Sequence, residues 1–278
     1  MKRDTQLTAF AFALVVLAMP AMAQAVSFKN IDPPGSTTTF PFGINPQGDV
    51  VGNYIAGGVI HGFLLHDGNF STVDIQGATA TFARGISPQG DIVGFYVAGG
   101  VTHGFLLRKD ALTTIDFPGA TATLAFGTNP RGEIVGWYID QAGLNHGFLL
   151  QGGTFTTIDF PGSTSTRVFG INSRGDIVGF YVAAGVTHGF LLHQGAFTTI
   201  DFPGSPGTSV LGINPQGDLV GAYLAGGVMR GCVLRNGTFT LIDFPGATAT
   251  TVTGINAEGD VVGNYVSGGV THGFLALR

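Results

Sequence analysis

The chain repeats one unit of about 42 residues six times. The tripeptide Gly-Ile-Asn or a close variant begins at Gly43, Gly85, Gly127, Gly170, Gly212 and Gly254. The spacings between these glycines are 42, 42, 43, 42 and 42 residues. A repeat of this period indicates one supersecondary unit that buries its surface against copies of itself. The fold is therefore a ring or a stack of six similar units.

Each unit predicts four short strands. In the fourth copy the extended segments are TRVFGIN, DIVGFYV, HGFLLH and FTTIDF. The sequence NPQG after the first segment of the first copy suits a type I turn followed by a glycine bulge. The 46 glycines and 13 prolines, with only 10% charged residues, also favour strands and turns over helices. We expect each unit to be a four-stranded antiparallel meander.

The strands carry apolar residues on both faces, so each sheet has to be covered on both sides. Four-stranded units arranged around an axis meet this need, as in a β-propeller. The segment VSFKNIDPPG near the N-terminus matches the fourth segment of a unit, whereas the chain ends after a third segment, HGFLALR. We expect an all-β, six-bladed β-propeller with four antiparallel strands per blade, in which the N-terminal strand closes the last blade. An open β-solenoid is the alternative, and it does not explain the matching ends.

The first residues have the layout of a secretory signal peptide. Lys2 and Arg3 precede an apolar run from Leu7 to Met19, and Ala21-Met22-Ala23 suits cleavage. We assign residues 1–23 to the signal, with cleavage after Ala25 or an uncleaved anchor as alternatives, and residues 24–278 to a single propeller domain. The mature chain is then exported to the periplasm or the medium without stable membrane insertion. Its lone cysteine, Cys232, allows no intramolecular disulfide, so packing has to provide the stability.

The repeats resemble the extracellular HAF repeats of bacterial secreted proteins. The stretches that carry the resemblance are GINPQGDVVGNY and HGFLL, and it extends through all six units. The chain has glycine and leucine where the family motif His-Ala-Phe-Leu-Trp has alanine and tryptophan, and tyrosine where a small residue is usual. The resemblance implies export and a repeat architecture, but no particular chemistry.

A histidine recurs at the start of the third predicted strand. The five copies are His61, His103, His146, His188 and His272, and Arg230 takes the position in the fifth unit. The third strand lies two strand spacings from the innermost one, which places these side chains at least roughly 10 Å from the axis and from one another. Zinc ligands lie about 2.0–2.1 Å from one ion, so the histidines cannot share a metal. We expect them to be structural groups that hydrogen-bond to the backbone, and we expect no metal.

All six tyrosines share one position on the second predicted strand. They are Tyr54, Tyr96, Tyr138, Tyr181, Tyr223 and Tyr265. Packing between blades, with each hydroxyl satisfied, is favoured over an aromatic platform for sugars.

Two carboxylate series also recur. One comprises Asp32, Asp74, Asp116, Asp159, Asp201 and Asp243, and the other comprises Asp49, Asp91, Glu133, Asp176, Asp218 and Asp260. Their turn contexts, DFPG and NPQGD, favour capping of turns over calcium binding or glycoside hydrolysis.

Residues that converge near the axis are the candidates for ligand binding. We expect a ring of threonines at one channel mouth, comprising Thr39, Thr81, Thr123, Thr166, Thr208 and Thr250. Two neighbouring columns vary between units: Phe40, Phe82, Leu124, Arg167, Ser209 and Thr251 in one, and Phe42, Arg84, Phe126, Phe169, Leu211 and Thr253 in the other. Variation on a constant frame is where a repeat protein encodes specificity. Arg84 and Arg167, the only charges there, would suit a small anionic ligand, but a structural role is favoured for these positions.

The sequence shows no nucleophile–base pair, phosphate-binding loop or cysteine–histidine cluster, and we expect no cofactor. A net charge of −5 argues against nucleic acid as a partner. We interpret the chain as a monomeric, non-catalytic binding or scaffolding module for a glycan, another cell-envelope ligand or an extracellular protein. A hydrolase or lyase of polysaccharides, which rests on analogy between propellers, is the alternative. A purely structural repeat protein is a third.

Overall fold

The computed structural model describes residues 27–109 and 111–278, all of which belong to strands or to the turns between them. The predicted signal peptide, residues 1–23, and both of its cleavage sites lie outside the described residues. The described part of the chain contains no helix with the length and apolar character needed to cross a membrane.

The described strands form six blades. The first contains β2 (Thr38–Ile44), β3 (Val50–Ala56), β4 (Val59–His66) and β5 (Asn69–Val73), and the second contains β6 (Ala80–Ile86), β7 (Ile92–Ala98), β8 (Val101–Arg108) and β9 (Ala111–Ile115). The third contains β10 (Ala122–Thr128), β11 (Ile134–Ile139), β12 (Asn145–Gln151) and β13 (Thr154–Ile158), and the fourth contains β14 (Ser165–Ile171), β15 (Ile177–Ala183), β16 (Val186–His193) and β17 (Ala196–Ile200). The fifth contains β18 (Thr208–Ile213), β19 (Leu219–Ala225), β20 (Val228–Arg235) and β21 (Thr238–Ile242), and the sixth contains β22 (Ala249–Ile255), β23 (Val261–Ser267), β24 (Val270–Leu277) and β1 (Ser27–Asn30).

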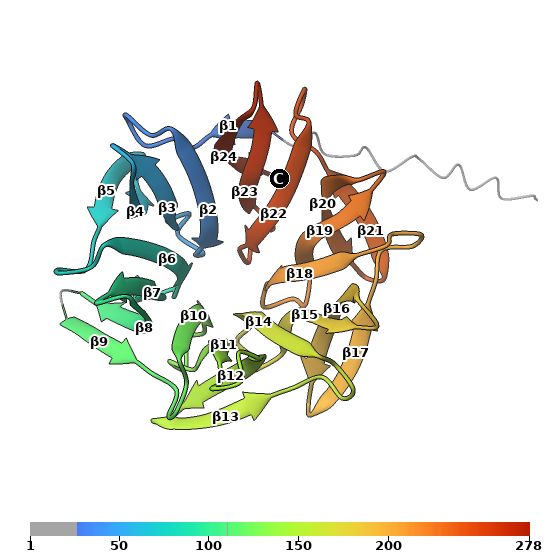
Figure 1. The fold of residues 1–278 in the computed structure, drawn as a ribbon. Helices are drawn as coiled ribbons and strands as arrows, with labels where there is room; N and C mark the ends of the chain where they lie inside the picture. Colours follow the sequence, from blue (N-terminus) through green and yellow to red (C-terminus); the bar gives the residue numbers. More distant parts are fainter. Residues whose placement is uncertain (1–26, 110) are drawn as a thin grey trace, which may run out of the picture.

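The blades stand around a central axis, with the first strand of each unit innermost (Figure 1). Within every blade, neighbouring strands pair antiparallel, as the meander prediction requires. Single parallel bridges, Ile60 with Ala80 and Thr102 with Ala122, join the first three blades at their edges. The third strand begins earlier than predicted: in the fourth blade it starts at Val186, two residues before His188. The six-bladed propeller predicted from the repeats is confirmed.

The N-terminal strand closes the ring. β1 pairs antiparallel with β24, from Ser27 opposite Leu277 to Asn30 opposite Phe274. The last blade thus obtains its outermost strand from the opposite end of the chain, which confirms the predicted closure and excludes the open solenoid.

Apolar side chains fill the space between adjacent blades. Five phenylalanines at one position of the third strand are fully buried: Phe63, Phe105, Phe148, Phe190 and Phe274. Cys232 occupies this position in the fifth blade, where burial raises the pKa of its thiol to about 12. The chain's only cysteine is therefore a small apolar core residue.

The glycine of the repeated Gly-Ile-Asn motif allows the innermost strands to approach one another. A Cβ atom on Gly43 would lie 2.9 Å from the carbonyl oxygen of Arg84 in the next blade, and one on Gly127 would lie 2.8 Å from that of Phe169. Neither glycine has a positive φ, so close packing around the axis explains the residue type.

Candidate functional site

The innermost strands enclose a cavity of about 110 Å³ on the ring axis. Three consecutive residues from each blade line it: Phe42 to Ile44, Arg84 to Ile86, Phe126 to Thr128, Phe169 to Ile171, Leu211 to Ile213 and Thr253 to Ile255. The first residue of each triplet belongs to one of the variable columns identified in the sequence. The sequence therefore located one column that forms the cavity wall.

The wall of this axial channel is asymmetric. Blades one, three and four each place a phenylalanine on it, and blade two places Arg84, whereas blades five and six place Leu211 and Thr253. A second aromatic layer from β7, β11 and β15 backs the first layer. Phe169 stacks on Phe180 with ring centroids 5.3 Å apart, and Phe126 lies 5.8 Å from Phe95. One side of the channel is thus aromatic and cationic, and the other is smaller and polar or aliphatic.

Arg84 lies in an aromatic cage without an acidic partner. Its guanidinium carbon is 3.6 Å from the centre of the Phe42 ring and 5.0 Å from that of Phe95. Its Nε and Nη1 atoms are shielded from solvent and form no hydrogen bond. Burial lowers the pKa of Arg84 to about 9, so the side chain still carries its charge at neutral pH.

Arg167 repeats this arrangement two blades further on. Its guanidinium carbon lies 4.5 Å from the Trp137 ring centre and 5.8 Å from that of Phe180. Its Nε atom is buried without a partner, as is Nε1 of Trp137, and burial lowers the pKa of Arg167. A buried oxygen of Asn53, on the second strand of blade one, also lacks a partner. Five of the six unpartnered buried side-chain atoms found among the described residues therefore belong to the two inner strands of blades one to four.

The predicted ring of threonines does not line the cavity. Thr39, Thr81, Thr123, Thr166, Thr208 and Thr250 are at most 2% exposed. The hydroxyl of Thr123 accepts a hydrogen bond from the amide of Phe117 at 2.9 Å, and Thr81 does the same for Ile75 at 3.1 Å. The threonines thus fasten the loops that connect consecutive blades. The hydroxyls of five of them accept from backbone amides, and that of Thr39 donates to Ser36 instead, so none lies on the cavity wall.

The repeated histidines pair with carboxylates. The Nδ1 atom of each lies 2.7–3.0 Å from the aspartate at the end of the fourth strand of the same blade: His61 with Asp74, His103 with Asp116, His146 with Asp159, His188 with Asp201, and His272 with Asp32. Arg230 pairs with Asp243 at 3.2 Å in the fifth blade. The expected backbone partner is thus replaced by a carboxylate. The signal in the sequence was the constant separation of 13 residues, which His188 and Asp201 illustrate.

The tyrosines lie between blades. Tyr138, Tyr181, Tyr223 and Tyr265 stack on a phenylalanine of the preceding DFPG turn with ring centroids 3.6–3.7 Å apart. The hydroxyl of Tyr181 lies 2.9 Å from that of Thr199, and the hydroxyl of Tyr265 donates to Asn30 at 2.7 Å. Because a phenylalanine covers one face of each of these four rings, they offer no open platform for a sugar.

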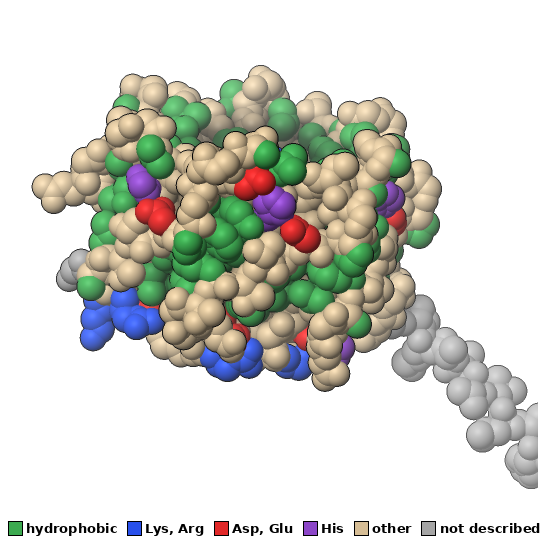
Figure 2. Space-filling view, turned by 60° about the horizontal axis from the view of Figure 1, so that its bottom comes forward, with side chains coloured by type: hydrophobic (Ala, Val, Ile, Leu, Met, Phe, Trp, Pro, Cys, Tyr) green, Lys and Arg blue, Asp and Glu red, His purple; other side chains and the backbone are tan. Residues whose placement is uncertain are grey.

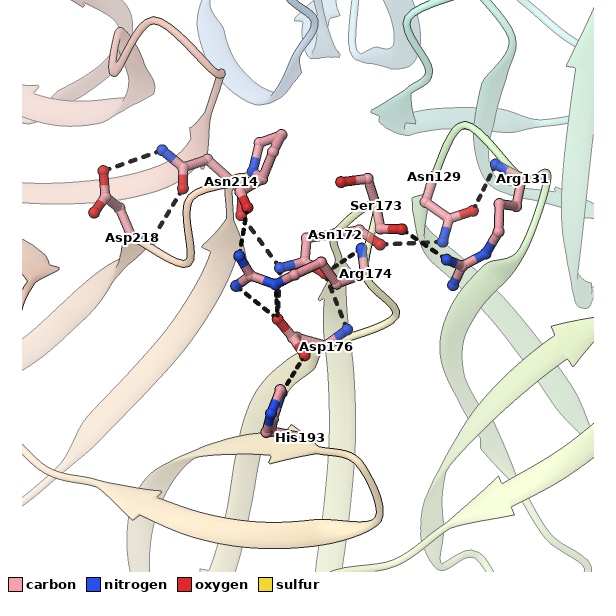
Figure 3. A network of polar contacts seen from close by, with 10 residues as sticks. Asn129, Arg131, Asn172, Ser173, Arg174, Asp176, His193, Asn214 and Asp218 are labelled. Carbon is pink, nitrogen blue, oxygen red and sulfur yellow. Dashed lines mark hydrogen bonds and ion pairs between the residues drawn. The ribbon is translucent and has the colours of Figure 1, made fainter.

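The second carboxylate series organises the turns at the opposite end of the blades. Asn172 donates to Asp176 at 2.8 Å, and Asp176 also accepts from Arg174 at 2.9 Å and pairs with His193 (Figure 3). Burial raises the pKa of Asp176, but these hydrogen bonds outweigh it and leave the pKa lowered. The prediction of turn capping thus describes only some of the contacts that this carboxylate makes.

The turn network extends from blade to blade. Arg131 donates to the carbonyl oxygen of Ser173 at 2.7 Å, and Arg174 donates to that of Pro215 at 2.8 Å. Figure 3 shows these arginines reaching across to the neighbouring turns. Lysine and arginine side chains gather toward one end of the ring in Figure 2, while histidines sit beside acidic side chains around its flank. The exposed charges therefore take part largely in pairs that hold turns.

Among residues 27–109 and 111–278, no three His, Cys, Asp or Glu side chains come together as a metal site would require. The histidine–aspartate pairs do not line the axial channel. The channel is the candidate functional site because a cavity, a variable column and the unpartnered guanidinium of Arg84 coincide there.

Several solved structures share the propeller fold. The chain is similar to virginiamycin B lyase from Staphylococcus aureus, with 12% identity, a TM-score of 0.51, and coverage of 90% of this chain and 88% of that one. It is similar to the fucose-specific lectin from Aleuria aurantia, with 14% identity, a TM-score of 0.53, and 85% and 91% coverage. TolB from Acinetobacter baumannii gives 10% identity and a TM-score of 0.54 over 86% of this chain and 63% of that one.

No protein-family model matches the chain, and no curated protein matches it in sequence. At identities of 10–14%, the likeness to the solved structures establishes the β-propeller fold alone.

Proposed function

We propose that this protein is an exported, monomeric, non-catalytic binding module that takes a glycan into its axial channel. The observation that carries the proposal is the asymmetric wall, on which three phenylalanine rings and the unpaired guanidinium of Arg84 face smaller side chains. Ring symmetry alone would repeat one side chain six times. Side chains that differ from blade to blade in the same cavity are what recognition of an asymmetric ligand needs.

The chemistry of the wall suits a sugar. Aromatic faces pack against the apolar faces of pyranose rings, and the guanidinium of Arg84 suits oxygen acceptors. A neighbour with the same fold is a fucose-specific lectin, which supports glycans as the ligand class. The signal-like N-terminus and the resemblance to HAF repeats support export, either to the periplasm or beyond the cell.

The composition of the cavity favours a binding role over the activity of a hydrolase or a lyase. Its eighteen lining residues include no carboxylate, imidazole, thiol or amine. General acid–base catalysis needs such a group within hydrogen-bonding reach of the substrate. The hydroxyl of Thr253, one of two on the wall, already lies 2.8 Å from the carbonyl oxygen of Pro41. A second role for the ring as a scaffold would leave the variable channel side chains without a purpose.

A glycan array tests the proposal. Purified protein should bind a restricted set of glycans, and Phe42→Ala should reduce that binding at least tenfold because it removes an aromatic face from the channel wall. Leu112→Ala is the matched control, since Leu112 lies on the outer strand β9 and is 44% exposed. Binding that survives Phe42→Ala, or release of shortened products from a bound glycan, would contradict the proposal.

A further inference from the structure

We propose that Arg84 forms an anion site within the channel, which binds a carboxylate carried by the ligand. This inference rests on the proposed function and deepens it, because it assigns an acidic group to the ligand. The partner is defined by its chemistry: an acidic sugar or another small organic acid.

The charge of Arg84 has no counter-ion in its surroundings. None of the eighteen lining residues is aspartate or glutamate, and no ion pair to Arg84 is found among the described residues. In contrast, Arg108, Arg131, Arg174, Arg230 and Arg235 each pair with a carboxylate. An uncompensated buried charge is costly and is retained where it serves a purpose.

The aromatic cage holds the cation but leaves its donors unused. The Phe42 ring, 3.6 Å from the guanidinium carbon, provides a cation–π contact. It cannot accept the N–H groups in the guanidinium plane, and Nε and Nη1 consequently lack partners. Because Nε and Nη1 are shielded from solvent, Nη2 is the guanidinium nitrogen that is open to the channel, where it can donate to a carboxylate oxygen.

The position of the guanidinium relative to the cavity favours a ligand over a missing protein partner. Arg84 lines the cavity directly, and the far wall consists of Leu211, Thr253 and their neighbours. The cavity volume of about 110 Å³ admits a carboxylate and the atoms attached to it. The second unpaired guanidinium, Arg167, adds positive potential on the aromatic side of the axis.

The test is a titration followed by two readouts. Sodium glucuronate, sodium acetate and neutral glucose are added at constant ionic strength, and thermal unfolding and the emission of Trp137, the chain's single tryptophan, are recorded. Trp137 is a suitable reporter because its ring contacts the guanidinium of Arg167. Glucuronate should raise the unfolding temperature and change the emission with saturation, whereas glucose should do neither at the same concentration.

Three variants separate a ligand site from a structural role. Arg84→Gln should weaken glucuronate binding at least tenfold, and Arg84→Lys should bind with intermediate strength because it keeps the charge but loses the planar guanidinium that packs on Phe42. Arg84→Met should unfold at the same or a higher temperature than the wild type, since it removes an unpaired charge. Arg108→Gln is the control for net charge and should bind like the wild type, because Arg108 is exposed and pairs with Asp91.

The outcomes distinguish this inference from the proposed function. Glucuronate binding that Arg84→Gln changes less than twofold overturns the anion site, as does equal binding of glucose. A protein that binds neutral glycans on the array through the channel but ignores glucuronate refutes the anion site and leaves the proposed function intact. If acetate binds as strongly as glucuronate and no glycan on the array binds, the anion site is supported for a small acid and the glycan function is refuted.

Discussion

The Nδ1 atom of His272 lies 2.9 Å from a carboxylate oxygen of Asp32, although 240 residues separate them in the chain. The same histidine–aspartate pair occurs 13 residues apart within other blades. Tyr265 and Asn30 add a second side-chain hydrogen bond across the junction, at 2.7 Å. The ring is therefore closed by the same contacts that hold each of the other blades together.

Removal of residues 27–31 should destabilise the whole ring. The truncation uncovers the edge of β24 and deletes Ile31, which is 2% exposed, so we expect a loss of roughly 3 kcal/mol or more in the free energy of unfolding. The single substitution Asp32→Ala should cost less, on the order of 1 kcal/mol. Urea unfolding of both variants checks this, and a truncated chain that unfolds at the wild-type urea concentration would contradict the closure.

Gly127→Ala should destabilise the axis of the ring. The added Cβ would lie 2.8 Å from the carbonyl oxygen of Phe169, so adjacent blades would have to separate. We expect a loss of roughly 1–3 kcal/mol, measured by thermal or urea unfolding. Gly48→Ala is the comparison variant: its Cβ would meet no atom within 4 Å, but the residue has a φ of +85°. A loss of stability in Gly48→Ala would therefore report backbone strain, whereas a loss in Gly127→Ala reports crowding. An unchanged stability of Gly127→Ala would rule out close packing as the reason for this glycine.

Ala276→Leu should stabilise the sixth blade. The corresponding residues of the other blades are Leu65, Leu107, Leu150, Leu192 and Leu234, each opposite the first residue of the second strand. A cavity of about 450 Å³ between blades five and six includes Ala276 in its lining. Filling it with a leucine side chain should contribute roughly 1–2 kcal/mol, measured as a higher unfolding temperature. Leu234→Ala should have the opposite effect, and a destabilised Ala276→Leu protein would show that the cavity cannot accept the side chain.

The pair around His146 should make stability depend on pH. Burial lowers the pKa of His146, but hydrogen bonds and charge attraction from Asp159 and Asp140 outweigh it and leave the pKa above the ordinary value of 6.5. The stabilisation is therefore complete below pH 6.5 and is lost as the pH rises through the folded-state pKa. We expect His146→Gln to lose more stability relative to the wild type at pH 5.5 than at pH 8.5, as urea unfolding would measure. A larger loss of stability in His146→Gln at pH 8.5 than at pH 5.5 would contradict a raised pKa of His146 in the folded protein.

The repeat period predicted the blades, because each copy shows the same turn positions and strand spacing. The closure of the ring was predicted because the N-terminal segment matches the fourth strand that the last unit lacks. Partners across blades were harder to predict. Thr123 was placed at the channel mouth, yet its hydroxyl binds the amide of Phe117, because the loop between blades folds back over the strand. Local sequence does not show which way such a loop turns. His188 is expected to bind the backbone, yet its Nδ1 atom pairs with Asp201, which recurs at a constant separation of 13 residues.

The channel residues could be predicted by column but not by environment. Variation between repeats identified Arg84 and Arg167 near the axis. That Arg84 packs on Phe42 of the preceding blade depends on how adjacent blades are rotated, which no single repeat encodes. The lack of a carboxylate near Arg84 likewise follows only from the assembled ring.

The number of ligand molecules bound per chain tests the account most directly. Six equivalent sites between blades would follow from the repeat, whereas the channel provides one site on the axis. Isothermal titration of the wild-type protein with sodium glucuronate, repeated with Arg84→Gln, measures both stoichiometry and the contribution of Arg84. One glucuronate per chain, weakened at least tenfold by the substitution, is the predicted result. Several molecules per chain, or binding that is unchanged in Arg84→Gln, would contradict a single axial site.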